Sequence, residues 1–318
     1  MKKVRVEAST KKDRTSEIFG NPMSKKVIRK AQKSKQKNQK KYGDDSKVNY
    51  QCIIRDNPCI GEPLGVKNVV VTRKEGKGSF DEEKGVIVGN IRMGFGHYRI
   101  SMAIASAAHA LGYTPYWMDL NSYPETTCTK LISAQNELYS LGSRISQKSK
   151  LFNKFVWEPV NYEGFRQLSY NAADQKNAEL MAPVYHSVPK DIPVIATHVW
   201  PAQAAVHAGM KHVVNAIPDN WPMALHYAQG SLHTVQTHYA YQGYRIGNGM
   251  MKDKVVQAMP PQDLMYTGHY IDHELAANIE KDCEARLSRL KNGEAMRFLL
   301  TVGGAGAQME IFGEVLHY

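Results

Sequence analysis

The sequence predicts an α/β protein built on a Rossmann-like, mostly parallel sheet. From residue 68 onward, short apolar runs typical of buried strands alternate with helical patterns, as in a parallel sheet covered by helices. Two of these runs lead into glycine turns that open a helix, and several end in a polar residue. At 318 residues the chain is long enough for two domains, or for one large domain with an extension.

The clearest unit runs from Gly85 to Leu120. Its apolar run, Val86 to Ile91, is typical of a strand covered on both faces, and Gly94 and Gly96 then allow a sharp turn. His97 stands where the next helix begins. A helix N-terminus presents free N–H groups and a partial positive charge, so we expect this corner to bind an anionic or polar ligand and to keep His97 neutral, as a general base must be. The alternative is a loose glycine turn whose histidine merely caps the helix.

The later elements follow the same alternation. We expect an outer strand over residues 69–72 and inner strands over residues 192–197, 211–216 and near 234. A last short strand is expected over residues 264–266, and helices are expected over residues 129–146 and 201–208. The segment between residues 151 and 185 is unusually aromatic. Its rings suit either a groove for an apolar or sugar acceptor, or ordinary core packing.

Polar residues follow the ends of four different predicted strands. They are His97, Asp119, His198 and Asp219, and Trp221 comes two residues after the last of them. In open α/β sheets the ligand crevice lies outside the carboxyl ends of the strands. We therefore expect these side chains to meet in one crevice.

The net charge of +11 lies in the first 50 residues. This basic tail holds 16 Lys and Arg against 5 Asp and Glu, whereas the remainder holds 25 of each. Between Ser24 and Lys41 nine residues are basic and only Val27 and Ile28 are strongly apolar, so we expect a disordered tail that cannot offset its ordering entropy. It forms either a transient basic helix on anionic lipid or nucleic acid, or a solvated segment without a partner.

The cysteines and the apolar segments bear on location. Four cysteines are scattered without metal-site spacing, which favours reduced thiols. The N-terminus lacks an apolar signal region, and no stretch of 18 apolar residues occurs. We expect a cytoplasmic protein and leave attachment to a membrane surface open.

A second unit is expected at the C-terminus. An amphipathic helix over Asp272–Lys291 precedes a strand over Arg297–Val302, and a glycine loop then carries the residues Gly303, Gly304, Gly306 and Gln308. The helix after this loop would start near Gln308, where N–H groups cradle a phosphate. Because the chain stops at Tyr318, we expect this second domain to be largely missing. The expected organisation is a tail (1–50), an N-terminal domain (51–270), an interdomain helix (271–295) and the start of a truncated domain (296–318).

The order of these pieces resembles the two-domain GT-B glycosyltransferases, in the branch of monogalactosyldiacylglycerol synthase and the N-acetylglucosamine transferase of peptidoglycan synthesis. The matching stretches are GFGH (94–97), VIATHVWPAQAA (194–205), VVNAIPDNWP (213–222), TGHYIDHEL (267–275) and FLLTVGGAGAQ (298–308). They span roughly residues 85 to 318.

The resemblance implies an acceptor domain followed by a nucleotide-sugar domain, without metal or cofactor. His97 would be the base and Asp219 its rival, near a lipid or other hydroxyl acceptor. Residues around them, Gly94, Phe95, Gly96, Asp119, His198 and Trp221, would bind substrate, and the loop Gly303, Gly304, Gly306 and Gln308 would approach the donor diphosphate. Phe95 and Tyr98 are bulkier than usual in that loop of the family, which leaves the acceptor open. We also expect most of the donor domain to be missing, which leaves open whether this chain is active by itself.

Three other interpretations remain open. A NAD-binding oxidoreductase would use the same glycine turn, with Asp119 on the ribose, although Arg99 replaces the third glycine. A metal hydrolase would use the histidines between residues 198 and 238, none of which has a recognised ligand spacing. A non-catalytic module would bind RNA or lipid through the tail, but the body is neutral and shows no RNA-binding signature, so we expect no specific nucleic acid.

Overall fold

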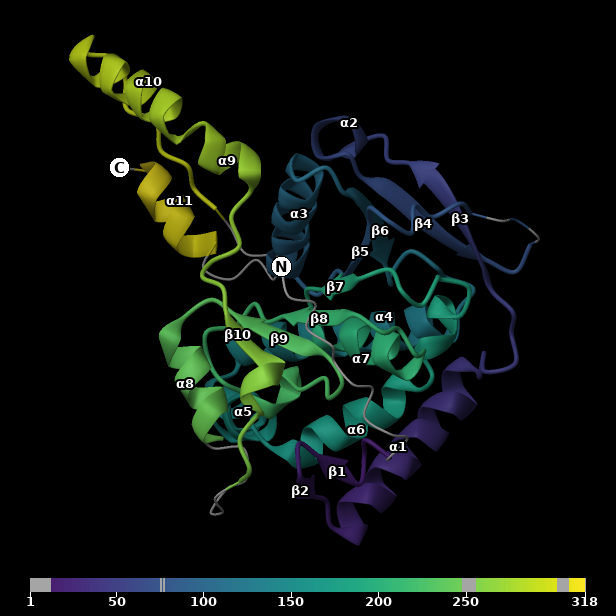
Figure 1. Cartoon of the computed structure of the whole chain (residues 1–318). Helices are drawn as coiled ribbons and strands as arrows, with labels where there is room; N and C mark the ends of the chain where they lie inside the picture. Colours follow the sequence, from purple (N-terminus) through teal and green to yellow (C-terminus); the bar gives the residue numbers. More distant parts are fainter. Residues whose placement is uncertain (1–12, 75, 77, 248–255, 302–308, 318) are drawn as a thin grey trace.

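The protein is described by a computed structural model that covers residues 13–74, 76, 78–247, 256–301 and 309–317. Its centre is an eight-stranded sheet in the order β10-β9-β8-β7-β5-β6-β4-β3 (Figure 1). All neighbouring strands are parallel except β3, which pairs antiparallel with β4. This confirms the predicted α/β fold with a mostly parallel sheet.

The strands of this sheet are short. Their bounds are β3 Gln51–Asp56, β4 Lys67–Thr72, β5 Gly85–Asn90, β6 Thr114–Asp119, β7 Val194–Ala196, β8 Val213–Ala216, β9 Leu232–Val235 and β10 Leu264–Tyr266. A separate two-stranded ribbon joins β1 Glu17–Ile18 to β2 Asn21–Pro22. The strand expected at residues 69–72 is β4, but it is not outermost, because β3 adds to its free edge.

The helices expected after Gly96 and over residues 129–146 and 201–208 are formed, as α3, α4 and α7. The bounds of the helices are α1 Lys25–Tyr42, α2 Gly61–Leu64, α3 Phe95–Ala110, α4 Thr127–Lys148, α5 Lys150–Phe152, α6 Leu168–Ala178, α7 Val199–His207, α8 His238–Ile246, α9 His273–Ala277, α10 Ile279–Lys291 and α11 Met309–His317. Within the described ranges, no helix combines the length and apolarity that a membrane span requires.

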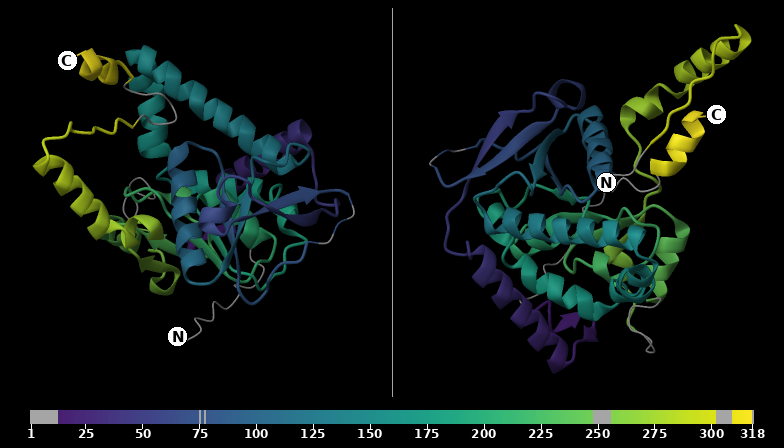
Figure 2. Two further views of the ribbon diagram at one scale, coloured as in Figure 1. Left: turned by 90° about the horizontal axis from the view of Figure 1, so that it is seen from above. Right: turned by 180° about the vertical axis from the view of Figure 1, so that it is seen from behind.

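Apolar side chains cover both faces of the sheet because successive strand residues point to opposite sides. Val88 packs with Ala105 of α3 and with Trp117. Its neighbour Ile87 belongs to a larger cluster on the other face, formed with residues of α4 and α7. Helix α3 therefore covers one face of the sheet, and helices α4 and α7 cover the other (Figure 2).

The chain changes direction between β5 and β7. From β5 it passes to β6 on one side, and later returns to β7 on the other side of β5. The carboxyl ends of β5 and β7 therefore form a topological switch point, where the connections diverge and leave a crevice.

The prediction of a disordered basic tail is wrong for residues 13–50. Helix α1 begins at the N-cap Ser24, whose hydroxyl accepts a hydrogen bond from the Val27 N–H, and packs on α6 with Ala31 buried. Ile18 and Phe19 enter a core cluster with Tyr227. The segment is ordered despite its polar composition because the body supplies the apolar surface that the segment itself lacks.

Two C-terminal predictions also need correction. The single helix over residues 272–291 is two helices, α9 and α10, which meet at Asn278. The strand expected from Arg297 is not formed over residues 297–301, and none of these residues pairs with a described strand. The loop residues Gly303, Gly304, Gly306 and Gln308 lie outside the described residues, and α11 begins directly after them.

Candidate functional site

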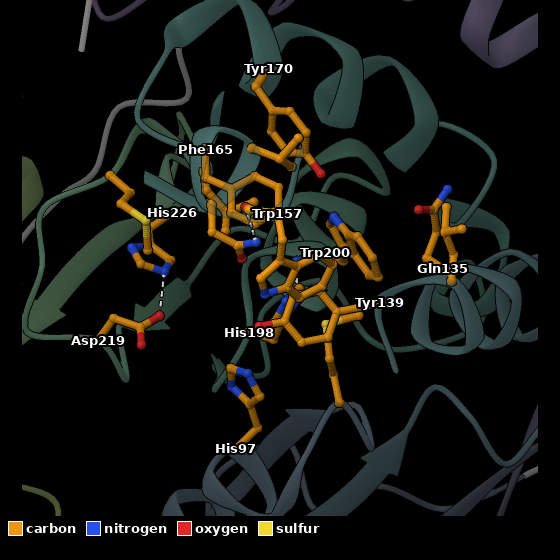
Figure 3. A pocket seen from close by; sticks show the side chains of 16 residues that line it. His97, Gln135, Tyr139, Trp157, Phe165, Tyr170, His198, Trp200, Asp219 and His226 are labelled. Atoms are coloured by element: carbon orange, nitrogen blue, oxygen red, sulfur yellow. Dashed lines mark hydrogen bonds and ion pairs between the residues drawn. The ribbon is translucent and has the colours of Figure 1, made fainter. Parts of the chain in front are cut away.

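A cavity of about 470 Å³ opens at the carboxyl ends of β5, β7 and β8. It combines three histidines and one carboxylate with an aromatic wall (Figure 3). The lining residues are Met93, His97, Gln135, Leu138, Tyr139, Trp157, Val160, Asn161, Phe165, Tyr170, His198, Trp200, Asp219, Met223, Leu225 and His226. The structure thus brings together three residues that the sequence analysis singled out, namely His97, His198 and Asp219.

His97 lies in the first turn of α3. Gly94 is the N-cap, with a φ of 82° that favours glycine, and no side chain caps this helix. The His97 Nδ1 lies 2.7 Å from the Thr197 carbonyl oxygen at the end of β7. Because a carbonyl can only accept, Nδ1 carries the proton and Nε2 has a free lone pair. Burial lowers the pKa of His97, although the Thr197 hydrogen bond and the charge of Asp219 oppose the shift.

His198 is the N-cap of helix α7 and lies next to His97. Its Nδ1 accepts a hydrogen bond from the Trp200 N–H at 3.1 Å, so in the neutral ring the proton lies on Nε2. The His198 and His97 rings meet edge to face, with centroids 4.9 Å apart. Burial holds the pKa of His198 well below its usual value, and the neighbouring histidines add to this shift. The two rings therefore offer one lone pair and one N–H donor side by side.

Asp219 follows β8 and is held by a histidine. Its Oδ2 lies 2.9 Å from the His226 Nε2, and the His226 Nδ1 lies 2.8 Å from the Tyr244 hydroxyl. Burial alone would raise the pKa of Asp219, but the hydrogen bond from His226 and the electrostatic interactions with the His226 and His97 imidazoles lower it below its usual value. Asp219 is therefore a carboxylate at neutral pH.

The aromatic segment between residues 151 and 185 forms the outer wall of the cavity. Three of its rings, those of Trp157, Phe165 and Tyr170, line the cavity, and none of them is fully buried. Two single π-helical turns, Asn153–Trp157 and Val160–Gly164, shape this wall. The Trp157 ring lies against Gly142 of α4 so closely that a side chain at that position would overlap the ring.

The other predicted site residues lie elsewhere. Asp119 lines a second, smaller cavity of about 240 Å³, where its Oδ2 accepts hydrogen bonds from the Arg92 Nε at 2.6 Å and the Ser122 hydroxyl at 2.9 Å. The structure therefore does not bring Asp119 into the crevice with the histidines. Phe95, between Gly94 and Gly96, points into solvent with 72% of its surface exposed.

Trp221 lies outside the main cavity, in an exposed aromatic group. Its ring centroid is 6.0 Å from that of Tyr162 and 5.6 Å from that of Tyr239. The Arg166 guanidinium lies 5.4 Å from both the Trp221 and the Tyr162 ring centroids. Trp221, which follows Asp219 by two residues, therefore does not line the cavity with it.

The sequence analysis missed His226 as the partner of Asp219. His226 appeared there only as one of several histidines considered for a metal. The signal that could have identified it is its position seven residues after Asp219, in the short 3₁₀ turn Ala224–His226. Across the part of the chain that the structure describes, no three His, Cys, Asp or Glu side chains are grouped as metal ligands.

Comparison with known proteins identifies two domain families. No curated protein and no solved structure matches the chain. The family described as Domain of unknown function (DUF6938) matches residues 259–318, and the family described as Domain of unknown function (DUF6937) matches residues 17–246. The second match covers most of the chain and includes α1, the sheet from β3 to β9 and all residues of the main cavity. The chain therefore belongs to the DUF6937 family.

Proposed function

We propose that this protein is a glycosyltransferase of the GT-B type, which transfers a sugar from a nucleotide-sugar donor to a hydroxyl group of a lipid or glycan acceptor. The proposal rests on the position of His97. This neutral histidine has a free Nε2, and it lines an aromatic cavity at the switch point of the sheet. An acceptor hydroxyl must lose its proton as it attacks the sugar, and a histidine of this kind is a suitable general base.

Asp219 and His198 support the same role. The Asp219 carboxylate can accept a hydrogen bond from the acceptor hydroxyl, and its negative charge favours the imidazolium that forms on His97 when the proton is taken. The His198 Nε2–H can donate to an oxygen of the same ligand. The reaction needs no cofactor, because proton transfer and positioning suffice for a displacement at an activated sugar.

The aromatic wall suggests which side of the reaction this cavity serves. Trp157, Phe165 and Tyr170 present apolar faces around the acid–base residues, as suits a sugar ring or the apolar part of a lipid. We therefore assign the cavity to the acceptor. The donor diphosphate would be held by the loop of Gly303, Gly304, Gly306 and Gln308, which lies outside the described residues.

The proposal is tested by a transfer assay on the full chain. The protein is incubated with a panel of radiolabelled nucleotide sugars and with diacylglycerol vesicles or soluble glycans, and labelled products are separated by chromatography. We expect one donor and acceptor class to yield product, with His97→Gln nearly inactive and His212→Gln, an exposed histidine away from the cavity, as active as the wild type. Absence of transfer from every donor, or tight binding of NADH in a fluorescence titration, would overturn the proposal.

A further inference from the structure

Helix α1 is fixed to the body along one side. Ala31 is buried against α6, the Lys35 Nζ lies 2.5 Å from Glu179, and the Asn38 amide donates to Asn177 at 3.0 Å. These positions recur every three or four residues, so they share one face of the helix. The contacts determine which side of α1 points away from the protein.

The opposite side of α1 carries a straight row of ammonium groups. At 100° per residue, positions 26, 30, 33, 37 and 40 fall within an arc of about 80°, centred opposite Lys35, and extend about 21 Å along the axis. We call Lys26, Lys30, Lys33, Lys37 and Lys40 the lysine row. All five side chains are exposed, and α1 forms the outer edge of the molecule in Figure 1 and in the right view of Figure 2.

The charge of the lysine row is not compensated nearby. Helix α1 contains no Asp or Glu, and none of the five ammonium groups pairs with a carboxylate among the residues that the structure describes. The lysine row is thus a rigid, unpaired positive surface, held in place by contacts that do not use its charges.

We propose that the lysine row is an electrostatic docking face for an anionic membrane surface. A plane of acidic headgroups reaches all five ammonium groups at once, because they lie in one line on the outer edge of the protein. Clusters of four to eight cations on a helix next to a membrane attract acidic lipids strongly. The apolar side of α1 faces the protein, so the contact depends on charge alone and must weaken as salt increases.

The same surface is less suited to nucleic acid. Single strands are bound through aromatic side chains on which bases stack, and the row has none, since Tyr42 is only partly exposed at the end of the helix. A duplex gains affinity from every phosphate that is neutralised, whereas the chain after residue 50 holds equal numbers of acidic and basic residues and adds no net positive charge.

The test compares two variants of the full chain with the same net charge. In the first, all five residues of the lysine row are changed to Gln, which preserves helix propensity. In the control, five exposed lysines outside α1 are changed to Gln, namely Lys67, Lys84, Lys130, Lys148 and Lys211. Binding is measured by sedimentation with vesicles of equal parts phosphatidylglycerol and phosphatidylcholine, with vesicles of phosphatidylcholine alone, and with a double-stranded RNA in competition. Circular dichroism checks that each variant is folded.

We expect wild-type protein to bind the anionic vesicles at low salt and not the neutral ones. The row variant should lose this binding by about 10²-fold or more, while the control variant loses far less. Equal losses in the two variants would show that net charge alone acts, and absence of vesicle binding by the wild type would also overturn the proposal. If RNA displaces the protein from the vesicles at a concentration lower than that of the lipid, the lysine row would be assigned to nucleic acid instead. None of these outcomes depends on sugar transfer.

Discussion

The His97 Nδ1 lies 2.7 Å from the Thr197 carbonyl oxygen and so joins the first turn of α3 to the end of β7. Ser101, one turn further along α3, adds a 2.8 Å contact between its hydroxyl and that of Thr197. Two segments about 100 residues apart therefore position one imidazole. The same bond determines which ring nitrogen carries the proton, and hence which one can act as a base.

The first prediction is that His97 acts in chemistry more than in folding. His97→Ala should lower turnover by about 10²-fold to 10⁴-fold, the usual contribution of a general base. It should destabilise the fold by only about 1 kcal/mol, because one hydrogen bond is lost. Initial rates and urea unfolding measure the two effects. Near-normal turnover would move the base to Asp219, and an unfolded variant would show that His97 is needed for packing.

The second prediction concerns pH. Since burial lowers the pKa of His97 below the usual 6.5, its Nε2 is already unprotonated at neutral pH. The value of kcat/KM should therefore rise with pH through a step centred below 6.5, and the pKa of Asp219, also lowered, should add no further step above pH 5. A profile of initial rates between pH 4.5 and 8 measures this. A step centred well above 7 would mean that a different group limits the reaction.

The third prediction concerns Asp174, a carboxyl buried behind the cavity wall. Burial raises its pKa from 3.8 to about 7, although a hydrogen bond from Trp200 opposes the shift, and its Oδ2 has no partner among the described residues. Between these two pH values the folded state holds a proton that the unfolded state has released, so the stability contributed by Asp174 falls as pH rises toward 7.

Asp174→Asn should remove this pH dependence. The wild type should lose on the order of 2 kcal/mol of its free energy of unfolding between pH 5 and pH 8, and the variant should not. The difference between variant and wild type should therefore grow by that amount. Urea unfolding at both pH values provides the measurement. Asp191→Asn, at an exposed ion pair with Lys211, is the control and should show no such gain at pH 8. A gain that is equal in both variants would contradict the assignment.

The fourth prediction tests the docking of α1. Ala31→Asp places a charge at a position that is 1% exposed and should lower the free energy of unfolding by about 2 to 4 kcal/mol. Gln36→Asp makes the same charge change at an exposed position of the helix and should cost less than about 1 kcal/mol. Thermal and urea unfolding compare them. Equal, small effects would indicate that α1 behaves as a solvated segment.

Much of the sheet could be predicted from local pattern. Continuous apolar runs ahead of polar residues located β5, β7 and β8, because a strand buried on both faces must be apolar along its length. A shorter run located β10, an edge strand of which only Leu264 is buried. The same pattern placed His97, His198 and Asp219 after strand ends, and parallel strands bring those ends to one edge. The sequence by itself therefore determined the fold class and most of the acid–base residues.

Only the tertiary structure decided which of these residues meet. Asp119 also follows a strand, yet Arg92 and Ser122 hold it in a different cavity, whereas His226 joins Asp219 through a short turn. Helix α1 is ordered for a similar reason, since its few apolar and amide groups need α6 as a partner. Partners far apart in sequence leave no periodic signal, because their pairing depends on how completed elements pack and on which buried polar groups remain to be satisfied.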